Sequence, residues 1–402
     1  MQTRKLLIIE KNLIAHSGHY WTQVGQLKKI LPKHSTHLLA GDCYDESFGR
    51  ADAKISSRDI FIGRQIARIR HGSMAEKFRA GMRLAKKAKV SDLRGSSLLQ
   101  GLRATAKRLS LSSQDIIVIP TADIDELEAA VQFVRHRDCS TPIHLRFVHH
   151  LLGETKELML EKRLAAVRPL LSAQIHLYSE TIEMADFLAQ KYNIEVQGGF
   201  FMPCSLPPEQ PIHVREKQDL FRVGVLGMAR KDKGSSRIGP ILDSLSELEE
   251  SPRGLKSKLP IVFAIQPDTP DIADSPYYGN ITRRDGLELH PASAGPDSFR
   301  VLLTSCDLLL LPYDLSEYRV RGSGLIQDAV AAGIPIVHTR GMAMQSFLDH
   351  GNALSAETPQ EFAEAILKVA RDPTKFKQGT STAQTYYAKL LRSSPFVPPL
   401  DI

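Results

Sequence analysis

The sequence predicts an α/β protein made of two doubly wound, Rossmann-like domains that face each other across a cleft. Short apolar runs alternate with helix-like stretches along both halves, and a proline-rich segment at 202–211 separates the halves. The apolar runs are nearly continuous, as in Ile116–Ile119, which is typical of parallel strands covered on both faces. Sheets of this kind bind ligands beyond the carboxyl ends of their strands, so the loops at those ends matter most.

The first half alternates expected strands with helix-like stretches. The strands are expected at Lys5–Glu10, Thr36–Ala40, Asp115–Pro120, Ile143–His149 and Gln174–Tyr178. The helices are expected near Tyr20–Leu31, within a basic segment at 64–108, and at Asp123–Arg135, Thr155–Leu171 and Thr181–Tyr192.

The second half repeats the alternation. The strands are expected at Phe221–Leu226, Ile261–Ile265, Leu287–His290, Asp307–Leu311 and Ile334–His338. The helices are expected at Ser236–Glu249, Pro296–Ser305, Gly324–Ala332, Met342–Asp349 and Pro359–Arg371. On this pattern the domains comprise residues 1–205 and 206–380, and a C-terminal segment at 381–402 is expected to pack back on the first domain.

The composition is that of an ordinary globular protein. Of 402 residues, 42% are hydrophobic and 24% are charged, which excludes a disordered chain, a collagen-like fibre and a small disulfide-bonded domain. No apolar run approaches the roughly 18 residues that cross a bilayer. The apolar run Leu6–Ile9 stops at Glu10 and Lys11, unlike a signal peptide, and the four cysteines lack metal or redox spacing. We therefore expect a cytoplasmic protein.

The net charge of +7 is unevenly distributed. Between Arg64 and Arg108, thirteen basic residues accompany two acids, Glu76 and Asp92, so the rest of the chain has a balance of −4. Apolar residues recur among these charges, and such a basic amphipathic segment suits an anionic surface at the inner face of the cytoplasmic membrane. A solvated helix face that packs by its apolar edge has the same pattern. The segment has few aromatic residues and no nucleic-acid motif, so nucleic acid is not an expected partner.

A first chemical motif follows the first strand of the second half, at Val223-Gly-Val-Leu-Gly-Met-Ala-Arg-Lys-Asp-Lys-Gly234. The strand ends at Gly227, and Arg230 and Lys233 lie in the loop that leads into a helix. Basic side chains at the carboxyl end of a strand, beside a helix N-terminus, suit a phosphate. The same residues also occur in ordinary surface turns, so this motif alone leaves both interpretations open.

A second motif runs from a buried strand that ends at Pro312, through an irregular loop, to Gly322-Ser-Gly324 and a helix. Small residues at the helix start allow backbone N–H groups to approach an anion, which the helix dipole favours. Asp328 lies one turn deeper on the same helix face, within reach of sugar hydroxyls next to a bound phosphate. The alternative is an ordinary loop with Asp328 in solvent.

Together the two motifs resemble the retaining glycosyltransferases of GT-B fold, the group also called glycosyltransferase family 4. The chain reads Asp328-Ala-Val-Ala-Ala-Gly-Ile-Pro-Ile-Val where the family reads Glu-Ala-Met-Ala-x-Gly-x-Pro-Val. Gly351-Asn352, followed by the helix that starts at Pro359, is similar to the closing loop and helix of the family. The resemblance is strong over Phe221–Arg371 and weak over the first half.

The resemblance implies a nucleotide-sugar donor and assigns residues to it. In this family's pattern, Arg230 and Lys233 would hold the donor diphosphate, and Asp328 would bind the ribose. Backbone N–H groups of Ser323 and Gly324 would contact the same phosphates. The full donor site implied in this way comprises Gly18, Gly227, Arg230, Lys233, Gly234, Ser323, Gly324 and Asp328.

The family also places a His after a strand of the first domain, near the transferred sugar. His149 and His150 are the candidates here, and with Arg230 and Lys233 they form the expected catalytic set. A strand-end His bonded to backbone is the alternative for either one. Gly18 would let the first loop approach the diphosphate. No metal-ligand cluster is found in the sequence, and the resemblance implies neither metal nor cofactor, because basic residues and a helix dipole supply the charge.

One departure from the family is clear. The family usually has two acids eight residues apart, but the position eight before Asp328 is Val320, and Glu317 stands three residues earlier still. We expect a glycosyltransferase (EC 2.4) that moves a sugar from a nucleotide-diphosphate donor to a polysaccharide or lipid-linked acceptor, with retention. The alternatives are a nucleotide-sugar epimerase on the same fold and a non-catalytic binding or scaffold protein. A dinucleotide-dependent dehydrogenase is disfavoured, because no strand is followed by Gly-x-Gly-x-x-Gly.

Overall fold

A computed structural model divides the chain into two compact units, which are described separately. The first unit comprises Met1–Glu180 and Met184–Phe200, and the second comprises Thr181–Glu183 and Phe201–Ile402. The structure describes residues 3–13, 18–41, 44–45, 51–55, 96–135, 140–202, 219–251, 257–269, 274–278, 281, 285–291 and 296–392. The proline-rich segment, apart from its first residue, and residues 64–95 of the basic segment lie outside these ranges.

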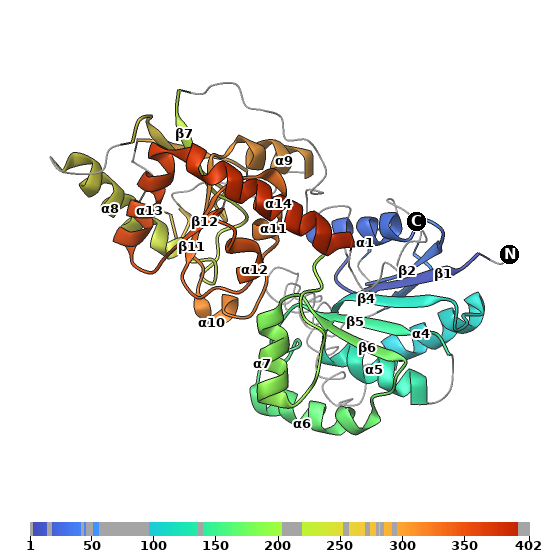
Figure 1. The fold of residues 1–402 in the computed structure, drawn as a ribbon. Helices are drawn as coiled ribbons and strands as arrows, with labels where there is room; N and C mark the ends of the chain where they lie inside the picture. The colour runs from blue at the N-terminus through green and yellow to red at the C-terminus, as the bar shows by residue number, and fades with distance from the viewer. Residues whose placement is uncertain are drawn as a thin grey trace, which may run out of the picture. The chain divides into compact units, whose positions relative to one another are not determined.

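The first unit contains a parallel sheet with the strand order β3-β2-β1-β4-β5-β6 (Figure 1). The order reverses between β1 and β4, so the carboxyl ends of these two strands form the switch point of a doubly wound sheet. Its strands are β1 (Lys5–Glu10), β2 (Ser35–Gly41), β3 (Ala53–Ile55), β4 (Ile116–Ala122), β5 (Ile143–Phe147) and β6 (Ile175–Ser179).

Helices connect these strands as the crossover rule for parallel sheets requires. Helix α4 packs on α5, and α5 packs on α6. The helices are α1 (Gly18–Ile30), α4 (Ser96–Leu109), α5 (Ile124–Arg135), α6 (Glu157–Val167) and α7 (Ile182–Tyr192), with a short 3₁₀ turn at Arg168–Leu170.

The second unit repeats the topology, with the strand order β12-β11-β10-β7-β8-β9 (Figure 1). Its switch point lies between β7 and β10, which pair in parallel. The strands are β7 (Phe221–Val225), β8 (Ile261–Ile265), β9 (Leu287–Leu289), β10 (Leu308–Leu311), β11 (Ile336–Thr339) and β12 (Ala353–Ala356). The helices are α8 (Ile238–Glu250), α9 (Pro296–Ser305), α10 (Leu315–Tyr318), α11 (Gly324–Ala332), α12 (Gln345–Leu348), α13 (Pro359–Arg371) and α14 (Lys377–Arg392).

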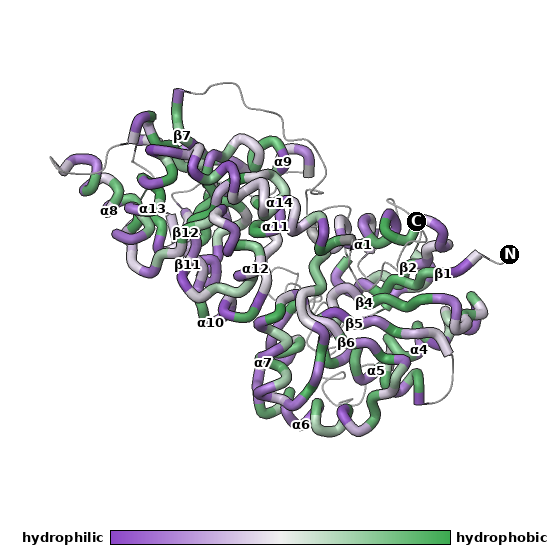
Figure 2. Tube along the Cα trace, viewed as in Figure 1, coloured by the Kyte–Doolittle hydropathy of each residue, from purple (hydrophilic) through white to green (hydrophobic). Residues whose placement is uncertain are grey.

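Strand β10 explains why its apolar run is continuous. Leu308 and Leu310 belong to the hydrophobic cluster that includes α8 and α13, whereas Leu309 and Leu311 belong to the cluster that includes α9, α11 and α14. Side chains alternate between the two faces of a strand, so a sheet with a core on each face needs an apolar residue at every position. Strands β1 and β4 of the first sheet are likewise hydrophobic along most of their length (Figure 2).

The structure confirms an α/β chain with two doubly wound parallel sheets. Most expected elements are present within one or two residues, but the strand expected at Ile143–His149 ends at Phe147, so His149 lies in the following turn. Residues 381–392 form the end of α14, which packs on α11 and α12 within the second unit. Packing of 381–402 on the first domain stays a prediction. None of the helices in the described ranges combines the length and apolar character needed to cross a bilayer.

Candidate functional site

The loop after β7 turns sharply at Gly227. Its φ of +78° lies in the left-handed region that favours glycine, and its N–H donates to Gln266 Oε1 at 2.7 Å. Gln266 follows β8 and is itself fixed by a bond from its side-chain amide to the carbonyl of Pro291. The turn leads the loop back over the strand end, where the ammonium group of Lys233 lies against Gly227: a Cβ added there would stand 2.6 Å from Lys233 Nζ.

The same loop is fixed to the end of β10 at Gly234. This residue has a φ of +66°, and a Cβ on it would stand 1.8 Å from the carbonyl oxygen of Pro312. The N–H of Asp314 donates to the carbonyl of Asp232 at 2.8 Å, and Arg237 also bonds to the Pro312 carbonyl. The loops after the two switch-point strands are therefore joined by backbone contacts, and Gly234 is required by the lack of space.

Three cations gather at these loops. Arg230 donates to Asp232 Oδ2 at 2.9 Å and to the hydroxyl of Tyr318 at 3.2 Å. Arg321 extends over the ring of the same Tyr318, with Cζ at 5.6 Å from the ring centroid. Lys233 is the third cation. Tyr318, on α10, thus contacts two guanidinium groups, that of Arg230 through its hydroxyl and that of Arg321 through its ring. No motif in the sequence indicates this contact.

The surroundings of Lys233 change its pKa. Burial, together with the positive charges of Arg230 and Arg321, lowers the pKa of Lys233 to about 8. Within the described ranges, no carboxylate or carbonyl oxygen pairs with its ammonium group. A desolvated ammonium group next to other cations is stabilised by an anion, so the geometry favours a negatively charged ligand at this place.

Helix α11 starts at the same edge of the sheet. Ser323 is its N-cap residue, but its N–H donates to Met344 Sδ at 3.1 Å and not outward. The N–H groups of Gly324 and Leu325 have no acceptor among the described residues and fit the expected phosphate contact better. Asp328 is 3% exposed, so the alternative that placed it in solvent is wrong.

The structure describes Val320, which stands eight residues before Asp328, where the glycosyltransferase pattern usually has an acid. The carbonyl of Val320 accepts a short hydrogen bond from the hydroxyl of Thr181, so its backbone is fixed within the second unit. Glu317, on α10, lies with its carboxylate 4.0 Å from the guanidinium of Arg321. No side-chain acid stands at position 320, and Arg321 follows it directly.

In the first unit, His149 and His150 lie in the turn after β5. Their rings stack with centroids 4.8 Å apart, and His150 meets Phe187 of α7 edge to face. The N–H of Leu151 donates to His149 Nδ1 at 3.2 Å, which leaves Nε2 as the protonated nitrogen of the neutral ring. Gly18 is the first residue of α1.

A polar group that the sequence analysis missed lies at the switch point of the first sheet. Glu10 ends β1 and is 1% exposed, and burial raises its pKa to about 7. Arg146, on β5, is fully buried and donates to the carbonyls of Phe200 and Pro120 and to Glu180 Oε1, at 2.7, 3.1 and 2.8 Å. Glu10 and Arg146 lie in the expected strands Lys5–Glu10 and Ile143–His149, where a charge within an apolar run is the only sequence signal for them.

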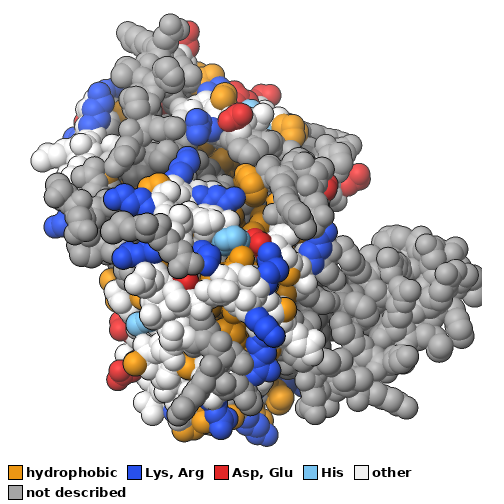
Figure 3. Space-filling model, turned by 90° about the vertical axis from the view of Figure 1, so that its right-hand side faces the viewer, with side chains coloured by type: hydrophobic (Ala, Val, Ile, Leu, Met, Phe, Trp, Pro, Cys, Tyr) orange, Lys and Arg blue, Asp and Glu red, His pale blue; other side chains and the backbone are white. Residues whose placement is uncertain are grey.

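The basic segment is described only from Ser96, where α4 begins. The proposed membrane contact through 64–108 therefore lies largely outside the described residues. On the face drawn in Figure 3, the Lys and Arg side chains of the described residues occur in several small groups, separated by uncharged side chains.

Comparisons with known proteins agree with the topology. No protein-family model matches the sequence, and no curated protein sequence matches it significantly. Solved structures do match over nearly the whole chain. The lipopolysaccharide outer core galactosyltransferase WaaB has 13% identity and a TM-score of 0.60, with 98% of this chain and 99% of that chain covered.

Two further matches extend the comparison. HepE of Anabaena, solved in complex with UDP, has 14% identity and a TM-score of 0.59 over 96% of this chain and 95% of that chain. UDP-GlcNAc 2-epimerase from Methanocaldococcus jannaschii has 11% identity and a TM-score of 0.51 over 95% and 99%. At these identities the likeness concerns the fold: the chain has the GT-B fold that glycosyltransferases share with an epimerase.

Proposed function

We propose that the chain is a glycosyltransferase that takes a nucleotide-diphosphate sugar as donor. The observation that supports this most is Lys233, whose ammonium group is desolvated, lies against Gly227 and is flanked by Arg230 and Arg321. The phosphates of a donor would supply the anionic partner that Lys233 lacks among the described residues. During transfer the leaving diphosphate gains negative charge, which Arg230, Lys233 and the start of α11 would stabilise without a metal.

The remaining donor contacts follow from the same edge of the sheet. Asp328, one turn into α11, would accept hydrogen bonds from the ribose, and Gly324 would contribute its backbone N–H to the phosphates. HepE, a structure of the same fold, was solved with UDP, which makes UDP-sugars the first donors to test. His149 and His150 are proposed to contact the transferred sugar, and Gly18 to allow the first loop to approach the diphosphate.

The stereochemistry, the acceptor and the location of the reaction are also part of the proposal. We propose transfer with retention to a polysaccharide or lipid-linked acceptor, in the cytoplasm or at the inner face of its membrane, with neither metal nor cofactor. Residues 64–108 would contact anionic lipid. A nucleotide-sugar epimerase is the second candidate, because the M. jannaschii epimerase shares the fold over nearly the whole chain.

Calorimetric titration of UDP and UDP-glucose tests the donor site. Lys233→Met should weaken UDP binding by at least tenfold, since it removes a charge-assisted contact of about 1.5–3 kcal/mol. Lys231→Met is the matched control, because Lys231 is an exposed lysine of the same loop. Equal affinities for the two variants and the wild type would contradict the assignment.

Product analysis separates the two candidate reactions. The wild-type chain is incubated with a donor that it binds, once alone and once with acceptors, and the sugars are identified by NMR. A transferase gives a glycoside only when an acceptor is present, whereas an isomerised nucleotide sugar in the absence of acceptor would identify an epimerase.

A further inference from the structure

The turn after β5 (residues 148–154, the histidine turn) carries His149 and His150 and has a strained backbone. Leu152 has a φ of +46° and Gly153 a φ of +79°, so two consecutive residues adopt the left-handed conformation. For a leucine this conformation costs about 1–3 kcal/mol, and it persists only where the surrounding residues fix it. The side chain of Leu152 is fully buried, so the turn is held from within the unit.

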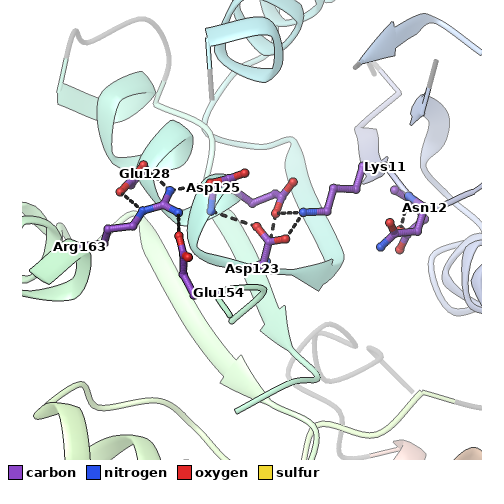
Figure 4. A network of polar contacts seen from close by, with 9 residues as sticks. Lys11, Asn12, Asp123, Asp125, Glu128, Glu154 and Arg163 are labelled. Carbon is purple, nitrogen blue, oxygen red and sulfur yellow. Dashed lines mark hydrogen bonds and ion pairs between the residues drawn. The ribbon is translucent and has the colours of Figure 1, made fainter. Parts of the chain in front are cut away.

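The start of α5 holds the middle of the histidine turn. The N–H of Ile124 donates to the carbonyl of Leu152 at 2.9 Å, so the turn accepts one of the N–H groups that a helix leaves unpaired at its start. Asp123 packs so closely against Gly153 that a Cβ on the glycine would stand 2.7 Å from Asp123 Oδ2. Asp123 is itself fixed, because its carboxylate pairs with Lys11 (Figure 4).

A group of ion pairs holds the end of the histidine turn. Glu154 accepts a hydrogen bond from Arg163 Nη1 on α6 at 2.5 Å. The same guanidinium donates to Glu128 at 2.7 Å through both Nε and Nη2, and to Asp125 at 2.5 Å (Figure 4). The side chains of Arg163 and Glu154 are only 12% and 11% exposed, so water competes little for their bond. Glu154 therefore ties the turn to two helices at once.

The histidine turn determines which nitrogen of His149 carries the hydrogen. The N–H of Leu151 donates to His149 Nδ1 at 3.2 Å, a bond that needs the chain to fold back within two residues. The N–H of Glu154 in turn donates to the carbonyl of Leu151 at 2.9 Å. Glu154 thus fixes the residue that bonds to the imidazole. A neutral ring whose Nδ1 accepts a hydrogen bond carries its hydrogen on Nε2.

We propose that Glu154 is a positioning residue for His149: held by Arg163, it fixes the turn that presents the ring with the hydrogen on Nε2. The inference rests on the proposed function, in which His149 contacts the transferred sugar, and adds the residue that orients this contact. With the hydrogen on Nε2, that nitrogen can donate to a sugar oxygen, whereas in the other tautomer it can only accept. Glu154 acts through the turn and not on the sugar itself.

The test compares Glu154→Ala and Glu154→Gln with the wild type. Glu154→Ala removes the bond to Arg163 but leaves the guanidinium paired with Asp125 and Glu128, so no buried cation loses its last partner. Glu154→Gln keeps a side-chain oxygen that can accept the same bond. Glu161→Ala is the matched control, because Glu161 is an exposed glutamate of α6. Urea unfolding first establishes that each variant is folded.

Three properties of each folded variant are then measured. Calorimetry gives the affinity for UDP. The release of UDP from UDP-glucose, in the presence of methyl and octyl glycosides as acceptors, gives kcat. NMR of isotope-labelled histidine gives the tautomer of His149, whose signal is identified by its loss in His149→Gln.

The expected result separates turnover from binding. Glu154→Ala should retain UDP affinity, lower kcat by about tenfold to hundredfold, as a displacement of about 1 Å can, and show both tautomers of His149. Glu154→Gln and Glu161→Ala should resemble the wild type. A folded Glu154→Ala variant with the wild-type kcat or the wild-type tautomer would overturn the proposal, and so would a Glu154→Gln variant that is equally impaired.

Failure of the inference and failure of the proposed function give different results. If the wild type binds UDP and turns over UDP-glucose, and Glu154→Ala does so equally well, the inference alone fails. If UDP binds but UDP-glucose is not turned over, the tautomer decides, and a single wild-type tautomer in Glu154→Ala overturns the inference. If no nucleotide binds, the proposed function itself fails, and the inference falls with it.

Discussion

Lys233 Nζ lies so close to Gly227 that a methyl group on Gly227 would stand 2.6 Å from it. The two residues lie six apart, at the start and near the end of the loop after β7. Their contact holds the ammonium group over the carboxyl end of the second sheet, next to the start of α11. The position of the proposed donor-binding cation thus depends on the absence of a side chain at Gly227.

Gly227→Ala should displace Lys233 and strain the turn, because the φ of +78° disfavours any side chain. We expect UDP affinity to fall by about tenfold or more, the value of a charge-assisted hydrogen bond. Calorimetry on folded protein checks this. Gly239→Ala is the control, since its Cβ would meet Ile281 at an ordinary 3.5 Å. Undiminished UDP affinity in Gly227→Ala would show that the contact does not position Lys233.

Gly234→Ala should damage folding more than binding. Its new Cβ would stand 1.8 Å from the backbone oxygen of Pro312, which no side-chain rotation relieves, and its φ is +66°. We expect a loss of several kcal/mol in the free energy of unfolding, or insoluble protein, because the loops after β7 and β10 must separate. Urea unfolding measures it, and a midpoint equal to that of the wild type would refute the contact.

Nucleotide binding should depend on the protonation of Lys233. Its pKa of about 8 in the ligand-free chain means that the ammonium group loses its proton above pH 8, while a bound diphosphate would favour the charged form. UDP affinity should therefore decline above pH 8, by at most tenfold per pH unit. Calorimetry in buffers of different ionisation enthalpy should also detect proton uptake on binding at pH 8.5. The decline should be absent in Lys233→Met, and a flat wild-type profile would contradict the role of Lys233.

The effect of pH on folding should be opposite to its effect on UDP binding, because the lowered pKa of Lys233 favours the folded chain at high pH. Its pKa is lower in the folded chain than its ordinary value of 10.5, so the unfolded chain binds more protons between pH 8 and 10.5. The contribution of Lys233 to the free energy of unfolding should rise with pH in that window.

His144 should make the first unit sensitive to acid. Burial, and the neighbouring His176, lower the pKa of His144 to about 4. The unfolded chain then binds the extra proton between pH 6.5 and 4, so stability should fall as the pH drops through that range, by at most about 3 kcal/mol. His144→Gln can retain the contact with Tyr178 without titrating. Urea unfolding at pH 7 and 5 should show a smaller loss for the variant, and an equal loss would exclude His144 as the cause.

Much of the fold could be predicted from the sequence, because a parallel sheet with a core on each face requires continuous apolar strands. The continuous apolar runs Leu308–Leu311 and Ile261–Ile265 predict strands for this reason. The short strands β3 and β12 have only three and four residues, too few for periodicity to detect. Helix α14 has a polar sequence, and its packing against α11 and α12 is a tertiary effect.

The donor loop could also be predicted from the sequence, because Gly227, Arg230, Lys233 and Gly234 lie within eight residues of one another. What the sequence could not reveal is contact between distant segments. Tyr318 and Arg321 join the loop only because β7 and β10 are neighbours in the sheet. Glu10 ends an apolar run in the sequence, and only the structure shows that its side chain is buried.

The central claim is that the carboxyl end of the second sheet binds a nucleoside diphosphate. A thermal-shift panel of UDP, GDP, ADP, CMP and NAD on the wild type and on Lys233→Met tests it most directly. A ligand present at 100 times its Kd stabilises the folded chain by about 2.7 kcal/mol, which is readily measured. We predict a clear shift with one nucleoside diphosphate in the wild type, and a much smaller one in Lys233→Met. No shift with any nucleotide, or a shift with NAD alone, would contradict the claim.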